Sequence, residues 1–173
     1  MSKNKTFCIL TIILLILLLS LFIVKIDTLL LINVNSDEII AFFKVSPEDT
    51  FSMQWIHSVE LEPWTEFFSI DKELNVVLDA TKFKAFGAGV PHSAGKKTVV
   101  EDGFIIFSEI NKTIPYIVYG ISYTAMHTFS FNDSTLELYK YVEPDTPVKI
   151  FAKRIRLYDF LVDKLKLQLN GSK

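Results

Sequence analysis

The chain has 173 residues, half of them hydrophobic, and a formal net charge of −2. This balance gives no electrostatic basis for nucleic-acid binding, and the length is enough for one domain with a core beside a membrane segment. Cys8 is the single cysteine, which excludes a disulfide within the chain and a metal site built on several cysteines.

The first predicted element is an apolar helix from Phe7 to Val24, a run without any charged residue. At about 1.5 Å per residue its length of about 27 Å is close to the hydrocarbon thickness of a bilayer. The lysines that precede it predict a cytoplasmic N-terminus, with the rest of the chain outside the cell membrane. A cleaved signal peptide is the alternative, but no small-residue cleavage site follows. We predict an uncleaved single-pass anchor within residues 1–27 and an extracytoplasmic domain over residues 28–173.

From about residue 28 the sequence changes to short aromatic and β-branched runs separated by turn sequences, which is typical of β-strands. The runs predicted as strands are Thr28–Val34, Glu38–Val45, Phe51–Ser58, Trp64–Asp71, Val76–Phe83, Lys97–Glu101, Phe104–Ile110, Tyr116–Tyr119, Ser122–Phe131, Leu136–Tyr141 and Val148–Lys153. In VVEDGFII, Asp102 and Gly103 predict the positive-φ pair of a tight hairpin turn. The spacing predicts a mainly β fold, an antiparallel β-sandwich or an open β-barrel in one domain.

The C-terminal segment RLYDFLVDKLKLQL, residues 156–169, differs because its apolar residues recur at helical spacing. This pattern predicts an amphipathic helix. Such a helix can cover a sheet edge or lie on the membrane surface. We favour the covering role and keep the membrane surface as the alternative.

The segment WIHSVELEPWTEFFSI, residues 55–70, crowds a histidine and three glutamates around the turn between two predicted strands. Alternate residues of a strand share a face, so His57 and Glu66 each continue the apolar face of their own strand. A turn centred on Leu61 and Glu62 would set His57 opposite Glu66. Directly opposed residues have Cβ atoms about 5 Å apart, so this register predicts an inward His–carboxylate pair.

Two roles for this pair are open. It can close the rim of the core, since a half-buried carboxylate needs a partner, or it can bind a ligand or a metal ion with Glu60 or Glu62 nearby. A metal-dependent hydrolase would need His57, Glu66 and a third ligand such as His92 around one ion. The spacing is not the helical zincin motif. No motif predicts a cofactor, and we expect no enzymatic activity.

The segment FGAGVPHSAG, residues 86–95, predicts a loop with unusual backbone angles at Gly87, Gly89 and Pro91. Exposed amides in such a loop can hold an anion, although the sequence lacks the third glycine and the helix of a phosphate motif. His92 lies in this loop and could approach His57, but the interpretation that we favour for it is a solvated loop residue. His127, by contrast, is predicted as a packed strand histidine because it alternates with apolar residues.

Arg154 and Arg156 are the only arginines and stand two residues apart. Arginine is the best side chain for bidentate carboxylate recognition, so the two could hold a carboxylate ligand. The interpretation that we favour is that they face the anionic membrane or pair with surface acids.

Several of these motifs together resemble a bacterial domain-of-unknown-function family. The matching residues, within roughly Phe51 to Tyr141, are HSVE at residues 57–60, Pro63, Glu66, Thr81 and Phe83, the FGAGVP segment, and Asp102 with Gly103. Members of that family are small envelope proteins commonly encoded beside TAXI-type TRAP transporters, which are ATP-independent uptake systems with an extracytoplasmic solute receptor. The resemblance implies an accessory role in solute uptake.

Three functions are therefore considered. The favoured one is contact with the TRAP membrane subunits or the TAXI-type solute receptor, which predicts an exposed apolar or aromatic patch. The second is binding or sensing of a small carboxylate by the His57 and Glu66 region with the glycine-rich loop or the two arginines, which predicts a concave pocket. The third is the metal-dependent hydrolase.

Overall fold

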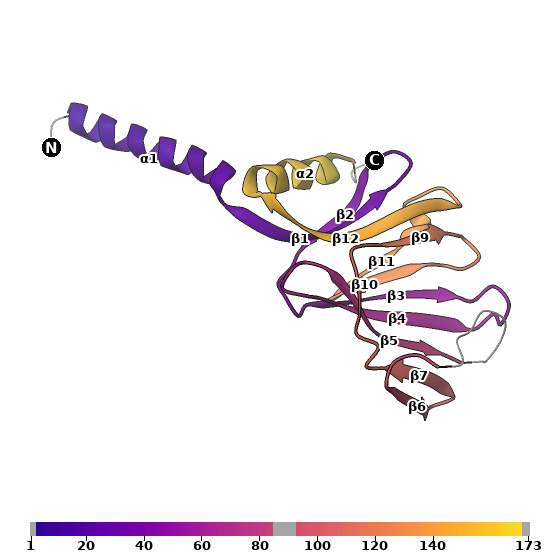
Figure 1. Ribbon diagram of the computed structural model, residues 1–173. Coiled ribbons are helices and arrows are strands. Elements are labelled where there is room, and N and C mark those ends of the chain that lie inside the picture. The colour runs from indigo at the N-terminus through magenta and orange to yellow at the C-terminus, as the bar shows by residue number, and fades with distance from the viewer. Residues whose placement is uncertain (1–2, 85–92, 171–173) are drawn as a thin grey trace.

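The computed structural model describes residues 3–84 and 93–170 of the chain (Figure 1). Helix α1 (Lys3–Ile23) comes first, and helix α2 (Leu157–Asn170) comes last. Between them lie a short 3-10 helix, η1 (Leu138–Lys140), and the strands β1 (Lys25–Asn33), β2 (Ile39–Lys44), β3 (Thr50–Ile56), β4 (Pro63–Ile70), β5 (Val76–Phe83), β6 (Lys97–Glu101), β7 (Phe104–Ser108), β8 (Lys112–Ile114), β9 (Ile117–Ile121), β10 (Thr128–Phe131), β11 (Ser134–Glu137) and β12 (Thr146–Arg156). The fold is mainly β, as the sequence predicts.

Helix α1 projects away from the strands (Figure 1). Within the described residues it is the one helix long and apolar enough to cross a membrane, over Asn4–Ile23, and none of that stretch is buried against the rest of the chain. A helix of this kind can be a membrane anchor or a signal sequence. It is joined to β1 by Val24 alone.

The strands form two antiparallel sheets that pack face to face as a sandwich. The smaller sheet has the order β2-β1-β12-β9, and the larger has the order β11-β10-β3-β4-β5-β7-β6, with β8 paired to β5. The main core lies between the sheets, where Leu29 and Ile150 from the smaller one belong to the same buried cluster as Met53, Phe68 and Phe129 from the larger. The predicted sandwich is therefore found.

The alternating pattern of the strands decides which side chains enter this core. In β3, Phe51 and Met53 are buried while Thr50 and Gln54 are exposed. Strand β1 departs from alternation because Thr28 to Leu31 are all buried. Such a continuous buried run is expected when both faces of a strand are covered.

Helix α2 provides that second cover. It packs on the outer face of the smaller sheet, where the Phe160 ring meets the edge of the Phe42 ring with centroids 5.1 Å apart. Figure 1 shows α2 lying along this sheet on the side opposite the larger sheet. The predicted C-terminal helix is thus confirmed, and it covers the smaller sheet.

Several predicted bounds are wrong where local hydrogen bonds compete with strand pairing. The predicted strand Ser122–Phe131 begins only at Thr128, because the Met126 N–H donates to the Ser122 carbonyl and the Thr124 N–H to the Ser122 hydroxyl. The predicted strand Leu136–Tyr141 is split between β11 and η1, and β8 was not predicted. The tight turn is as expected, with φ of 51° at Asp102 and 76° at Gly103.

Candidate functional site

The hairpin of β3 and β4 carries the residues that the sequence singled out, but its register differs from the predicted one. Trp55 pairs with Trp64, and Glu66 pairs with Met53 rather than with His57. The connection is a loop over residues 57–62, longer than the expected turn. The observed pairing differs from the predicted one by four residues along β4. Because four is an even number, the side chains of the strands keep their predicted faces. The predicted His57–Glu66 pair does not form.

His57 instead organises the loop. The backbone N–H of His57 donates to the Glu62 carbonyl at 2.9 Å, and the backbone N–H of Leu61 donates to the His57 carbonyl at 2.9 Å. Its Nδ1 accepts the Glu60 N–H at 3.3 Å. The ring stacks on Trp64 with a centroid distance of 5.6 Å. His57 therefore acts in the described structure as a cap that shapes the loop.

Glu66 has a partner from the opposite sheet. The Tyr119 hydroxyl on β9 donates to Glu66 Oε2 on β4, so this hydrogen bond links the two sheets across the core. Burial raises the pKa of the Glu66 carboxyl, an effect that the Tyr119 hydrogen bond opposes in part. Burial, followed by the neighbouring Glu66 charge, also raises the pKa of Tyr119. The pair is a half-buried polar contact between two largely apolar sheet faces, and sequence reasoning missed its tyrosine.

Aromatic rings lie on the tyrosine side of this pair. The Trp55 ring lies 5.7 Å from both the Trp64 and the Tyr119 rings and 6.2 Å from His127, as centroid distances. His127 is buried, and its Nδ1 accepts the Ser122 N–H at 3.3 Å. Burial lowers the pKa of His127. The prediction that His127 is packed agrees with this burial, although the residue ends a turn and precedes the strand.

Exposed apolar side chains gather at the end of the hairpin. Val59 and Leu61 in the β3–β4 loop are 62% and 74% exposed, and Tyr123 and Met126 in the β9–β10 loop are 52% and 46% exposed. The Ile56 N–H, at the end of β3, donates to the Ala125 carbonyl at 2.7 Å, so the β9–β10 loop lies beside the start of the β3–β4 loop. We call Val59, Leu61, Tyr123 and Met126 the tip patch. Figure 1 shows the β3–β4 loop at the end of the sandwich opposite α1.

The two predicted site arginines, which the structure does describe, lie apart from the β3–β4 hairpin. Arg154 forms a two-pronged ion pair with Asp27, at 2.6 Å from Nε and 2.9 Å from Nη2. Arg156 is exposed and pairs with Lys25 in the β1–β12 ladder, next to the end of α1 and away from the tip patch. Gly87, Gly89, Pro91 and His92 lie outside the described residues.

The space beside His57 is small. A hollow of about 10 Å³ lies between His57, Glu60, Glu62, Trp64 and Lys84. That volume is about what one water molecule needs. Glu62 and Lys84 form an ion pair of 3.2 Å across its edge. The described residues here leave no room for an organic solute.

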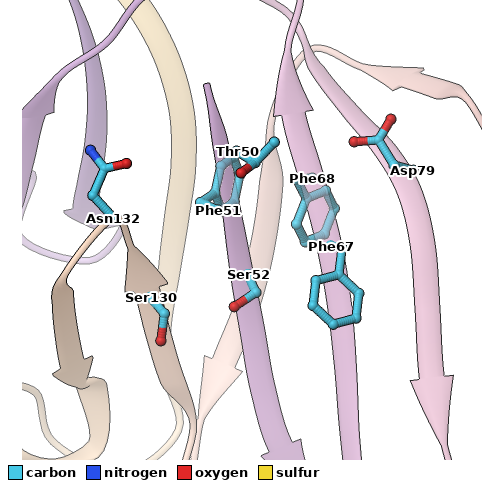
Figure 2. A pocket seen from close by; sticks show the side chains of 8 residues that line it. All are labelled: Thr50, Phe51, Ser52, Phe67, Phe68, Asp79, Ser130 and Asn132. Atoms are coloured by element: carbon cyan, nitrogen blue, oxygen red, sulfur yellow. The ribbon is translucent and has the colours of Figure 1, made fainter. Parts of the chain in front are cut away.

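A larger hollow lies on the outer face of the larger sheet, where the sequence predicted nothing. Figure 2 shows its lining, which consists of Thr50, Phe51, Ser52, Phe67, Phe68, Asp79, Ser130 and Asn132. Its volume is about 450 Å³ and it is open to solvent. Asp79 is the extra residue of a β-bulge between Phe67 and Phe68 on the β4–β5 pair. No local pattern marks such a site, because it assembles from β3, β4, β5 and the β10–β11 turn.

No group of three His, Cys, Asp or Glu side chains that could hold a metal ion occurs in residues 3–84 and 93–170. His57 and Glu66 do not converge, and the third proposed ligand, His92, is not among those residues. The described geometry therefore gives the hydrolase hypothesis no support.

One comparison with known proteins finds a match. The family model described as Domain of unknown function (DUF1850) matches residues 51–138, just over half of the chain. This match includes the β3–β4 hairpin, the Glu66–Tyr119 pair and the tip patch. No curated protein and no solved structure matches the chain.

Proposed function

This chain belongs to the DUF1850 family of domains of unknown function, and we propose that it is a membrane-anchored extracytoplasmic accessory protein of a TAXI-type TRAP solute uptake system. In this proposal α1 is an uncleaved anchor with its N-terminus in the cytoplasm. The β-sandwich then stands outside the membrane and acts by contact with the solute receptor or with the membrane subunits of the transporter. The association with this transporter class rests on the family resemblance of the motifs.

The observation that carries the contact role is the tip patch. Its four side chains are large, apolar and 46% to 74% exposed, and they come from two loops that a backbone hydrogen bond from the end of β3 to Ala125 brings side by side. Tyrosine and methionine are enriched at protein interfaces, and exposed apolar patches mark interaction sites. Ion-paired Glu62 and half-buried Glu60 lie at its border, as the polar rim of an interface would.

Its position supports a partner outside the bilayer. Figure 1 places the β3–β4 loop at the end of the sandwich remote from α1. A patch in that position would be presented toward a soluble or protruding partner rather than toward lipid. The solute receptor is therefore the partner that we favour over the membrane subunits.

The test is an affinity purification of the detergent-solubilised full-length protein, co-expressed with the transporter encoded beside it. A Val59→Ser and Leu61→Asn double variant removes apolar contact area, and asparagine tolerates the positive φ of 54° at Leu61. Val100→Ser, at a site 72% exposed on β6 outside the patch, is the matched control. We expect the receptor or a membrane subunit to co-purify with the wild type and the control and to be lost from the double variant.

Two results would count against the proposal in different ways. Equal recovery of the partner by the double variant would remove the tip patch from the contact. The absence of every transporter component from the wild-type eluate would refute the accessory role itself. A folded double variant, shown by an unchanged near-ultraviolet spectrum, is needed for either conclusion.

Small-ligand binding is a second candidate function, and the hollow in Figure 2 favours it. Its volume of about 450 Å³ lies within the range of ligand pockets, and it combines the exposed Phe67 ring with hydroxyl groups, an amide and the Asp79 carboxylate. Because that carboxylate is the charged group of the lining, a hydroxylated or cationic solute fits better than a carboxylate. Calorimetric titration of such solutes should show binding that Asp79→Ala abolishes, and a lack of binding in the wild type would exclude this function.

A further inference from the structure

Helix α2 has two apolar faces, and in the part of the chain that the structure describes the smaller sheet covers only one of them. Phe160 points to the smaller sheet, where its ring contacts Phe42, and Leu167 borders the hollow beside β2. The other face carries Tyr158, Leu161, Leu165 and Leu169, which are 44%, 46%, 58% and 64% exposed. We call these four residues the outer stripe.

The spacing of the outer stripe shows that it is one continuous surface. Its members follow one another at intervals of three or four residues, so they lie on one side of the helix. At 100° per residue this side is opposite Phe160 and Leu167. Lys164 borders it on one flank, and Asp159 and Lys166 lie on the other. Four large apolar side chains that face water in a row are unfavourable, because removing each of them from water would lower the free energy.

The outer stripe continues the apolar surface of α1. The Phe22 ring, at the end of α1, stacks on Tyr158 with a centroid distance of 5.2 Å and an interplanar angle of 18°. The Leu157 N–H donates to the Val24 carbonyl at 2.8 Å, so α2 begins where α1 ends in space. Figure 1 shows α1 projecting away from the strands, and α2 lying near the end of α1 on the face of the smaller sheet that is opposite the larger sheet.

We propose that the outer stripe lies in the interfacial layer of the lipid bilayer, so that α2 is a second membrane contact beside the α1 anchor. The inference rests on the proposed anchoring by α1. The sandwich would then sit on the aqueous side of α2, with the smaller sheet nearer the membrane. Two contacts at one junction would fix the tilt of the domain, and hence the direction in which the tip patch is presented.

The charges of α2 define the kind of membrane contact. Asp159 and Asp163 balance Lys164 and Lys166, and Lys166 lies 4.0 Å from Asp163. A helix without net charge gains little from anionic lipid, so apolar burial supplies the attraction. The contact should therefore occur on zwitterionic as well as anionic bilayers and should resist salt.

The test uses spin labels on the full-length protein, reconstituted at one copy per nanodisc of phosphatidylethanolamine and phosphatidylglycerol. The native Cys8 on α1 is exposed and reports the anchor. Leu165→Cys and Leu161→Cys, each in a Cys8→Ser background, report the outer stripe. Leu61→Cys in the same background is the matched control, since Leu61 is a leucine 74% exposed at the tip patch. Collision rates with oxygen and with a water-soluble nickel complex give the depth of each label.

We expect the labels at Cys8, Leu161 and Leu165 to favour oxygen over nickel several-fold more than the label at Leu61, and 0.5 M salt to leave the difference unchanged. Labels at Leu161 and Leu165 that meet nickel as often as the label at Leu61, with Cys8 still in the apolar phase, would overturn the inference and leave the anchor intact. An aqueous Cys8 label would instead refute the anchoring. Because each disc holds a single copy and no partner protein, shielding by a second copy or by a transporter helix cannot imitate the expected result.

Discussion

The β3–β4 hairpin has a body, made of its two strands, and a loop over residues 57–62. Glu66 lies in the body and Glu62 in the loop, and these two glutamates lie in different environments. In the body, Glu66 is half-buried and hydrogen-bonded to Tyr119 of the other sheet, whose ring contacts Trp55. In the loop, Glu62 forms an ion pair with Lys84 in which both side chains are about 40% exposed. Ion pairs at such exposure contribute about 0–1 kcal/mol, whereas a buried group that loses its partner costs about 1–3 kcal/mol.

The difference separates the requirements of folding from those of contact. Glu66 and Glu62 are the same amino acid, but only Glu66 points between the two sheets and can link them. The exposed loop contributes little to stability and is free to carry the apolar side chains of the tip patch. Changes in the body should therefore alter the free energy of unfolding, and changes in the loop should alter partner recovery.

The largest effect should come from the core of the body. Phe68→Ala removes a ring that is 1% exposed and stacks on Phe51 at 4.9 Å, so we expect a loss of about 3–5 kcal/mol. Urea unfolding of the detergent-solubilised chain can be followed by the fluorescence of Trp55 and Trp64, the only tryptophans, which pack together in one apolar cluster. Phe67→Ala, one residue away on the opposite face and 39% exposed, should cost less than about 1 kcal/mol. Similar costs for both would contradict the assignment of the two faces.

The hydrogen bond between the sheets should give the next largest effect. Glu66→Ala leaves the Tyr119 hydroxyl without its partner, and Tyr119→Phe leaves the carboxylate without its donor, so each should cost about 1–3 kcal/mol. The double variant should lose less than the sum of the two. Urea unfolding of the three variants measures this coupling, and strictly additive costs would show that the two groups do not interact.

The pH dependence should be smaller and has a definite sign. The pKa of Glu66 is raised in the folded chain above its ordinary value of 4.5, so its contribution to stability is fully present below that pH and is lost as pH rises through the folded pKa. Glu66→Gln removes this titration. The stability of Glu66→Gln relative to wild type, measured as the difference between their free energies of unfolding, should therefore be greatest near pH 7 and should decrease as the pH falls toward 4.5. A difference that is constant with pH would show that burial does not perturb this carboxyl.

The loop should give the smallest change in stability. Leu61→Asn replaces a side chain that is 74% exposed and keeps the left-handed backbone, so the free energy of unfolding should change by less than about 0.5 kcal/mol. The same variant should weaken recovery of the transporter component. A loss of more than about 1 kcal/mol would mean that the loop supports the fold, and the contrast between body and loop would fail.

Much of the architecture follows from local pattern. The uncharged run Phe7–Val24 predicts α1, and the alternating runs predict β5 and β6 at their observed bounds, because helix and strand periodicity are properties of neighbouring residues. The same alternation places His57 and Glu66 on the correct faces even though their pairing is wrong. The Asp102–Gly103 turn was predictable because few residue pairs tolerate two positive φ angles.

The register and the partners of the polar residues depend on contacts between distant segments. The β3–β4 loop is longer than expected because Leu61 takes a left-handed conformation and the His57 ring accepts the Glu60 N–H, details that alternation does not encode. Tyr119 is separated from Glu66 by 53 residues and meets it only because the two sheets pack face to face. Side-chain direction along a strand is local and could be inferred, whereas the neighbour across a core is set by how whole sheets stack.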